Sequence, residues 1–327
     1  MNAFIRNYWP KILLAGAMLF VTCGIIFSPH LPFSDNPTIQ KAVEFAIHGM
    51  ITLFALALLL FALGRYQLMF VAMGCVGALC VFLKSESNNH LILPKNELAP
   101  KLSIAHFNLS SVNDSREEFL EYVVDLDADV LSFQELTPDW NIFLTEGLKE
   151  KYKNSQRNVR IDFFGKALFT RNTIVDKNIL EIEGIPSLML SIKIGSQIVN
   201  LISLYCLPLD EKSKQVSLEQ LKVITQEITT SRFPTILLGD LNMVYWSNEI
   251  RAFRKNAKLE NSRRGFSPLG FKVPHDHMFF SRELECSNFE NLTDPKSNHL
   301  GLFGSFQFKN LPSEEEIRAS VGSLGSK

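Results

Sequence analysis

Cysteine and an excess of basic charge are both scarce in this sequence. Its five cysteines among 327 residues form no CxxC pair and no Cys/His spacing typical of zinc, which excludes a disulfide framework or zinc module. Cys206 and Cys286 lie in strand-like stretches and are expected to be buried free thiols. Residues 101–327 carry 27 basic and 30 acidic side chains, whereas proteins that depend on nonspecific nucleic-acid binding are usually basic. The composition therefore argues against that class of protein.

Charge is also absent from three long apolar stretches near the N-terminus, at residues 12–27, 45–63 and 67–83. Each is close to the roughly 20 residues that cross a bilayer. Buried core helices are the alternative, and a cleaved signal peptide would account for the first stretch alone. Three successive stretches favour a membrane domain at residues 1–84 with three transmembrane helices.

An odd number of spans places the two chain ends on opposite sides of the membrane. The flanking basic residues divide almost evenly between the two sides. The usual dominance of the first helix favours a cytoplasmic N-terminus. We therefore expect a multi-pass protein of the bacterial inner membrane with an extracytoplasmic C-terminal domain.

The remaining chain is predicted to form an α/β domain at residues 101–310, after a linker at 85–100 and before a flexible tail at 311–327. The hydrophobic pattern predicts strands at residues 102–107, 130–133, 167–170, 188–194, 198–204, 235–238, 277–280 and 303–308. Helices are predicted at residues 114–126, 213–228 and 247–256. The mixture of strand–helix alternation and adjacent hairpins indicates mixed sheets covered by helices.

Acidic and amide side chains recur where the predicted strands end: Asn108, Glu135, Asp240 and Asn242. Open α/β sheets usually bind ligands at these strand ends. Mg²⁺ takes one or two carboxylates and keeps its other positions for water and substrate. Each residue also has an ordinary explanation, since Glu135 suits a solvated strand end and an Asp-x-Asn sequence favours a turn.

Two further residues precede strands near the C-terminus. Asp276 comes directly before one predicted strand, and His299 lies shortly before the last. An Asp paired with a His orients an imidazole for proton transfer. We expect His275 to be a surface residue and His277 to be packed within its strand.

Taken in order, these segments resemble the endonuclease/exonuclease/phosphatase superfamily, which includes DNase I-like nucleases, apurinic endonucleases, sphingomyelinases and inositol-phosphate phosphatases. The resemblance covers residue 101 to about residue 308, and the later part looks most like a membrane-anchored bacterial branch. The motifs that carry it are HFNLS, QE, GKALFTR, GDLN, HDHMFFS and SNH. The implied fold is a four-layer α/β sandwich, two packed mixed β-sheets with helices outside.

The resemblance implies a divalent-metal site for Mg²⁺ or Mn²⁺. Glu135 would be the principal ligand with Asn108 beside it, and Asp240 and Asn298 would complete the set. The family's last motif is normally Ser-Asp-His, whereas this chain has Asn298 before His299. Asparagine keeps an oxygen ligand but lacks the charge, which puts a second metal site and full activity in question.

The resemblance also implies the catalytic roles. Asp240 would position or activate the attacking water, and Asn242 would bind the phosphate. His299 would transfer a proton or stabilise the phosphate, with Asp276 orienting it. Tyr205, in ISLYCLP, occupies a position where the family usually has a phosphate-contacting His.

Two functions of different classes follow. The first is a membrane-anchored, metal-dependent hydrolase of phosphate esters, a phosphodiesterase above all. The second is a catalytically weakened domain that binds phosphorylated ligands or a partner at the membrane, which Asn298 favours. Lipid head groups or small phosphodiesters are the favoured substrates, with nucleic acid as the alternative, and no obligate protein partner is evident. Tyr245, Trp246 and the 263–264 loop are expected to line the pocket or to form plain surface.

Overall fold

The computed structural model describes residues 2–32, 34, 36–88, 100–112, 115–209, 213–265, 273–293 and 301–309. The chain divides into two compact units. The first consists of Met1–Asn89, Met243–Ala252 and Arg264–Pro274. The second consists of His90–Asn242, Phe253–Arg263 and His275–Lys327.

Four helices form most of the first unit: α1 (Asn2–Ile26), α2 (Pro37–Glu44), α3 (Ala46–Ala62) and α4 (Tyr66–Ser85). Small residues allow close packing at their contacts, since Ala57 and Ala72 are almost fully buried. Large apolar side chains point outward instead, with Phe20 79% and Val81 71% exposed. Helices that are apolar on every side are typical of a membrane environment.

Two described helices are long and apolar enough to cross a membrane, Tyr8–Ile26 and Tyr66–Ser85. The middle predicted span, residues 45–63, corresponds to α3. Only together with the preceding segment Thr38–Glu44, to which it is bent by 71°, does Ala46–Ala62 pass as a possible span. By length and composition, these two helical segments make one further span only if they are counted as a single bent helix. The prediction of three spans is therefore supported for the outer two and stays a prediction for the middle one.

The segment Met243–Ala252 belongs to the helical unit although it follows Asn242 directly in the chain. Tyr245 and Trp246 are fully buried, and the indole Nε1 of Trp246 donates to the carbonyl of Val43 over 2.7 Å. The prediction that these two aromatic residues line a pocket or form plain surface is wrong. The sequence could not show this, because the partner carbonyl lies about two hundred residues away.

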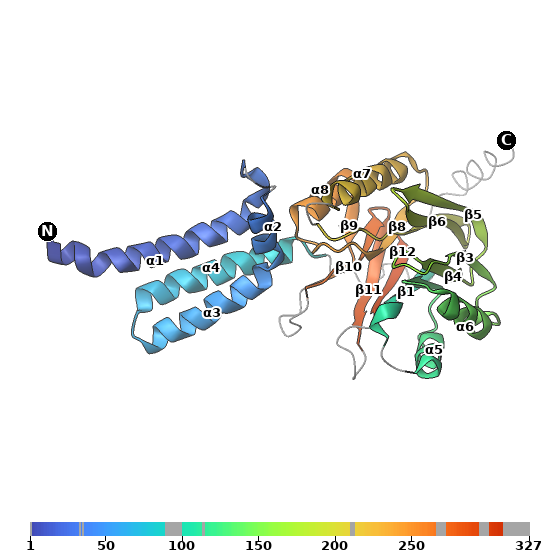
Figure 1. The fold of residues 1–327 in the computed structure, drawn as a ribbon, viewed down its shortest axis with the longest axis horizontal. Coiled ribbons are helices and arrows are strands. Elements are labelled where there is room, and N and C mark those ends of the chain that lie inside the picture. The colour runs from blue at the N-terminus through green and yellow to red at the C-terminus, as the bar shows by residue number, and fades with distance from the viewer. Residues whose placement is uncertain are drawn as a thin grey trace. The chain divides into compact units, whose positions relative to one another are not determined.

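The second unit contains two six-stranded mixed sheets (Figure 1). The first has the order β11-β12-β1-β2-β4-β3, formed by Leu284–Leu292, Gly301–Phe308, Lys101–Asn108, Val130–Gln134, Lys166–Thr170 and Asn154–Asn158. The second has the order β5-β6-β7-β8-β10-β9, formed by Ile174–Ile182, Ile185–Ile194, Gln197–Ser203, Thr235–Asp240, Asp276–Ser281 and Leu259–Asn261. β1 is parallel to β2, β7 is parallel to β8, and the other pairs are antiparallel.

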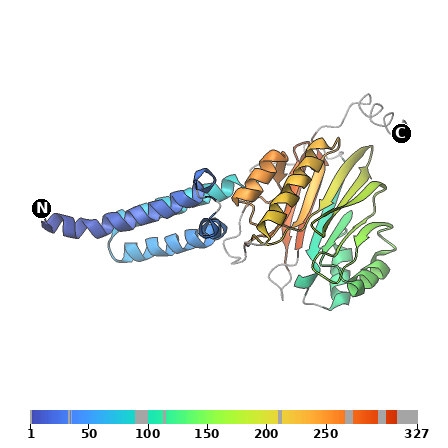
Figure 2. The same ribbon diagram turned by 45° about the horizontal axis from the view of Figure 1, so that its top comes forward.

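Helices lie outside the two sheets, as Figure 2 shows from a second side. α5 (Arg116–Asp125) and α6 (Pro138–Leu148) bury Phe119 and Leu144 in a cluster with the outer face of the first sheet. α7 (Lys214–Thr230) buries the apolar stripe of Leu221, Ile224 and Ile228, and α8 spans Asn248–Asn256. Two mixed sheets flanked by helices confirm the predicted fold class.

The side chains between the sheets follow the two-residue period of a strand. Leu188, Leu190, Ile192 and Ile194 of β6 all enter this central core, together with alternate residues of β1. On β1 the period places Leu102, Ile104 and His106 on the inner face. Phe107, on the opposite face, packs under α5. The alternation therefore places His106 between the sheets.

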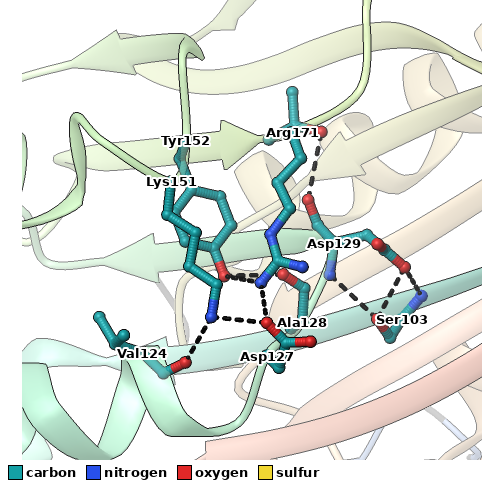
Figure 3. Close-up of polar contacts among 9 residues, drawn as sticks. Ser103, Val124, Asp127, Ala128, Asp129, Lys151, Tyr152 and Arg171 are labelled. Atoms are coloured by element: carbon teal, nitrogen blue, oxygen red, sulfur yellow. Dashed lines mark hydrogen bonds and ion pairs between the residues drawn. The ribbon is translucent and has the colours of Figure 1, made fainter.

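A charged cluster holds the end of the first sheet where β2 begins (Figure 3). Asp127, which has a left-handed backbone at φ 51°, pairs with Lys151 at 2.5 Å and Arg171 at 2.6 Å. Hydrogen bonds from both cations lower the pKa of Asp127 to about 2. Tyr152 donates to the carbonyl of Ala128 over 2.7 Å. This cluster stabilises the turn from α5 into β2, at the opposite end of β2 from Glu135.

Candidate active site

The adjacent parallel strands β1 and β2 bring Asn108 and Glu135 together. Asn108 is paired in register with Gln134, which directly precedes Glu135. The Asn108 Nδ2 donates to Glu135 Oε1 over 2.9 Å. The Asn108 Oδ1 accepts from the backbone N–H and the hydroxyl of Ser110, at 3.1 and 2.8 Å. The amide therefore orients the carboxylate while its own oxygen is held by the following turn.

Two of the predicted site residues have a strained backbone. Glu135 has φ 59° and Asn242 has φ 50°, both in the left-handed region. That conformation costs a non-glycine residue roughly 1–2 kcal/mol, although asparagine tolerates it better. Glutamate has no such tolerance, and strain of this kind clusters at functional sites. The strained backbone of Glu135 is therefore consistent with a functional position.

Gln134 connects the two sheets beside the site. Its fully buried amide donates from Nε2 to the carbonyl of Leu204 and accepts at Oε1 from the N–H of Asp240, both over 2.8 Å. Gly239 permits this close approach, because a Cβ there would lie 1.9 Å from the Leu204 oxygen and φ is 141°. Gln134 thus fixes the backbone on which Asp240 and Tyr205 are carried.

We expect Gln134→Leu to lower both stability and turnover, because it leaves a buried N–H and a buried carbonyl unpaired at about 1–3 kcal/mol each. Gln156→Leu is the matched control, since Gln156 is also buried and its Nε2 donates to the carbonyl of Asn178 on the other sheet over 2.7 Å. Thermal unfolding and steady-state kinetics should show destabilisation in both variants and a fall in kcat only for Gln134→Leu. Equal kcat values in the two variants would contradict a positioning role.

Two carboxylates face each other where β8 ends and β10 begins. Asp240 and Asp276 lie directly opposite each other in the antiparallel register, a position where like charges repel. Burial raises the pKa of Asp240 above its ordinary value of 3.8, and the charges of Asp276 and Glu135 raise it further. The backbone N–H of Asn242, 2.8 Å from Asp240 Oδ1, acts in the opposite direction. The carboxylates of Asp240 and Asp276 therefore repel each other in a largely buried position.

The two histidines beside Asp276 differ in their surroundings. His275 is half-buried, its charge lowers the pKa of Asp240, and its carbonyl accepts from Leu241 over 3.0 Å. The prediction that His275 is a plain surface residue is wrong, because the strand start turns it toward the carboxylates. His277 is 1% exposed and stacks on Phe279 at 5.1 Å, which confirms it as a packed strand residue.

Another histidine, which the sequence motifs did not indicate as a site residue, lies near Asp276. His106 is fully buried on β1, with Nδ1 3.0 Å from the hydroxyl of Ser132 and Nε2 3.8 Å from Asp276 Oδ1. The hydrophobic strand around His106 concealed it in the sequence. His299 and Asn298 lie outside the described residues, so the pairing of Asp276 with His299 stays a prediction.

Tyr205 lies within the same site. It is 9% exposed, its side chain hydrogen-bonds that of Asn242, and burial followed by the charge of Asp240 raises its pKa. Its ring lies 5.7 Å from Phe164 and 5.9 Å from the Nζ of Lys166. Asn242 also donates from Nδ2 to the carbonyl of Cys206 over 2.9 Å. The structure therefore brings Tyr205 and Asn242 together with Asp240.

Two buried basic residues lie close to these residues, and only Lys166 had no predicted role. Lys166 is fully buried, donates to the carbonyl of Pro186, and has its pKa lowered by burial to about 7. Arg263 is 7% exposed and its Nη2 donates to the backbone carbonyl of Asp276 over 3.3 Å. Arg263 therefore holds the backbone of Asp276 from a buried position. The alternative prediction, that the 263–264 loop forms plain surface, is wrong for Arg263.

The donor set matches a hard cation such as Mg²⁺ better than zinc. Among the described residues no three His, Cys, Asp or Glu side chains form a group that could hold a metal on its own. Zinc sites use three or four such ligands, whereas Mg²⁺ takes one or two carboxylates and completes its shell with water and substrate. Glu135 and Asp240 are the two carboxylates that would hold such a cation, and it would offset the repulsion between them.

Comparison with known proteins places this site in a family. The model of the Endonuclease/Exonuclease/phosphatase family matches residues 105–299, which is more than half of the chain. The chain belongs to the endonuclease/exonuclease/phosphatase family. The matched range contains every site residue described above. No curated protein sequence matches the chain.

Solved structures share the fold of this endonuclease/exonuclease/phosphatase domain at low identity. The human Nocturnin catalytic domain with bound sulfate is 16% identical, with a TM-score of 0.53 over 65% of this chain and 96% of that one. A Bacteroides thetaiotaomicron family member is 18% identical, with a TM-score of 0.52 over 64% and 95%. The mannosyl-6-phosphatase Bt3783 of the same organism is 18% identical, with a TM-score of 0.50 over 63% and 100%. At these identities the similarity shows the fold alone.

Proposed function

We propose that this protein is a divalent-metal-dependent hydrolase of phosphate esters, a phosphodiesterase above all. The observation that carries the proposal is the position of Asp240 directly opposite Asp276, with Glu135 close enough for its charge to raise the pKa of Asp240. Buried like charges cost stability unless a cation offsets them. A site built at that cost suits a metal and the phosphate that the metal binds.

Glu135 would hold the cation, with Asn108 keeping its carboxylate oriented and Asp240 supplying a second oxygen. Mg²⁺ or Mn²⁺ bound there supplies a Lewis acid for a phosphoryl oxygen. Asp240 would also accept the proton of the attacking water, since it lies beside Tyr205 and Asn242 in the same site.

The phosphate would be bound on the other side of the site. Asn242 and Tyr205 carry the N–H and O–H groups that can donate to its oxygens, and Gln134 keeps their strands in place. His299 would protonate the leaving oxygen with Asp276 orienting its imidazole, as the family motif implies. In-line displacement builds charge on the phosphoryl oxygens, which these donors would stabilise.

The substrate class has two candidates. Solved structures with the same fold include a mannosyl-6-phosphatase and a zebrafish TDP2 complexed with single-strand DNA product, the latter 14% identical with a TM-score of 0.51. The acidic balance of residues 101–327 favours a small phosphodiester or lipid head group over nucleic acid. Nucleic acid remains the second candidate.

We also propose that residues 1–84 are a membrane domain with three spans and that residues 101–310 form the hydrolase domain on the extracytoplasmic side. The two long apolar helices support the membrane domain. The side of the membrane rests on the distribution of flanking basic residues. A C-terminal alkaline phosphatase fusion should be active in cells, and an inactive fusion beside a fluorescent C-terminal green fluorescent protein fusion would place the domain in the cytoplasm.

The test is an activity screen of the purified full chain in detergent micelles with Mg²⁺ or Mn²⁺. We expect hydrolysis of bis-p-nitrophenyl phosphate that stops when EDTA removes the metal, and weaker or no cleavage of plasmid DNA. Phospholipids form the third arm of the screen. A protein that hydrolyses none of these substrates but binds phosphate would instead support the weakened binding domain that Asn298 favours.

A further inference from the structure

The turn between β3 and β4 exposes an unusual amount of apolar surface. Ile161 is 91% exposed and Phe163 is 65% exposed, and Val159 at 39% adjoins them. The other large apolar side chains exposed on the described part of this unit are isolated on α6 and β5: Ile142, Val175 and Ile179. Scattered single apolar residues are normal on a protein surface, whereas three of them within five residues of one turn are unusual.

Polar contacts hold this apolar turn in a defined conformation. The Arg160 guanidinium donates two hydrogen bonds to the Asp162 carboxylate, from Nε over 2.9 Å and from Nη2 over 2.7 Å. Asp162 also accepts from the backbone N–H of Phe164 over 3.0 Å. Arg160 and Asp162 are thus bonded to each other within the turn, and Ile161 and Phe163 are its most exposed side chains.

The base of the turn is attached to the active site. The Arg160 N–H donates to the carbonyl of Leu136 over 3.3 Å, and the Leu136 N–H donates to the carbonyl of Gly165 over 3.0 Å. Leu136 directly follows the proposed metal ligand Glu135. A Cβ at residue 165 would lie 2.1 Å from the Leu136 oxygen, so only glycine allows this contact. Phe164 continues the apolar surface inward, with its ring 5.7 Å from that of Tyr205.

We propose that the segment at residues 159–164, named here the apolar turn, binds the hydrocarbon chain of an amphiphilic phosphate ester whose phosphate lies between Glu135 and Tyr205. This inference rests on the proposed function and names its substrate class as a lipid-like phosphodiester. The ring contact between Phe164 and Tyr205 connects this apolar surface to the residues proposed to bind the phosphate, which suits a substrate with an apolar chain next to its phosphate. The two long apolar helices of the same chain would keep the protein where such substrates are dissolved.

The experiment compares two p-nitrophenyl phosphodiesters, a methyl ester and an octyl ester, with the full chain in one fixed detergent and Mg²⁺. The double variant Ile161→Ser, Phe163→Ser should lower kcat/KM about tenfold for the octyl ester and leave the methyl ester within about twofold. Val175→Ser is the matched control, an exposed apolar residue beside Asn154 at the opposite end of β3. It should leave both rates unchanged. An equal loss on both esters, or no loss on the octyl ester, would overturn the inference.

A second measurement separates this inference from the proposed function. In Phe163→Trp, octyl phosphate should shift the tryptophan emission to shorter wavelength, whereas inorganic phosphate should not. This shift needs no hydrolysis, so it can be present even if the wild-type chain cleaves neither ester. If the wild type is active and the emission does not move, the enzyme assignment holds and the apolar turn is not a substrate site.

Discussion

Glu135→Gln should lower Mg²⁺-dependent turnover by about 10³-fold or more, which corresponds to roughly 4 kcal/mol at the transition state. The replacement keeps the size of the side chain and an oxygen that can accept the 2.9 Å hydrogen bond from Asn108. It removes the negative charge that a hard cation requires. The fold should be unchanged, and the affinity for Mg²⁺ should fall together with turnover.

Glu183→Gln is the matched control for this variant. Glu183 is also a glutamate with a left-handed backbone, at φ 51°, but it is exposed on the turn between β5 and β6. Glu183→Gln should leave turnover and metal affinity unchanged. Calorimetric titration with Mg²⁺ and the dependence of kcat on Mg²⁺ concentration provide the measurement. An Mg²⁺ affinity in Glu135→Gln equal to that of the wild type would remove Glu135 from the metal site.

The sequence predicted the elements whose burial is regular. β6 buries every second residue between the sheets, and β2 is buried along its whole length, so both patterns are clear. The polar residues at strand ends were also predictable, because a carboxylate directly after an apolar strand interrupts the pattern. Asn108, Glu135 and Asp240 were found in this way, and Asp276 was found from its position directly before a strand.

The edge strands were missed for a physical reason. β3 reads NSQRN and β5 reads IVDKNILEI, and both lie at the edges of their sheets, where one side has no neighbouring strand. An edge strand needs little apolar burial and often carries charge, which also discourages pairing with other chains. Neither segment therefore has the hydrophobic period that identifies a strand in a sequence.

Buried polar residues were missed because their partners belong to distant parts of the chain. Gln134 bonds to Leu204 and Asp240, which lie 70 and 106 residues away. His106 meets Asp276 from the other sheet, and Lys166 approaches Tyr205 in the same way. A polar residue inside an apolar strand can be recognised in the sequence. Its hydrogen-bonding partners cannot, because they depend on which sheet packs against that strand.

Asp240→Asn should have two opposite effects: loss of turnover and, in EDTA at pH 7–8, a higher melting temperature. Turnover should fall about 10²- to 10⁴-fold, because the amide cannot accept the proton of the attacking water. The gain in stability arises because a neutral amide removes a buried charge that lies opposite Asp276 and near Glu135. Each 1 kcal/mol released should raise the melting temperature by roughly 2–4 °C.

The pH dependence of this gain follows from the raised pKa of Asp240. Between its ordinary value of 3.8 and the raised value, the folded protein holds a proton that the unfolded chain has released, so wild-type stability falls as pH rises through this range. The advantage of Asp240→Asn in EDTA should therefore be small near pH 4 and largest above neutrality. Thermal unfolding across this pH range measures it, and Asp176→Asn, an exposed aspartate on β5, should show no such trend.

Saturating Mg²⁺ should reverse the order of stability. A ligand at 100 times its Kd stabilises the folded state by about 2.7 kcal/mol, and only the wild type retains the full carboxylate set that binds the cation. The wild type should therefore melt above Asp240→Asn in Mg²⁺ and below it in EDTA. If Asp240→Asn were less stable than the wild type in EDTA at every pH, Asp240 would be a structural residue, and the repulsion between Asp240 and Asp276 could not be attributed to a metal site.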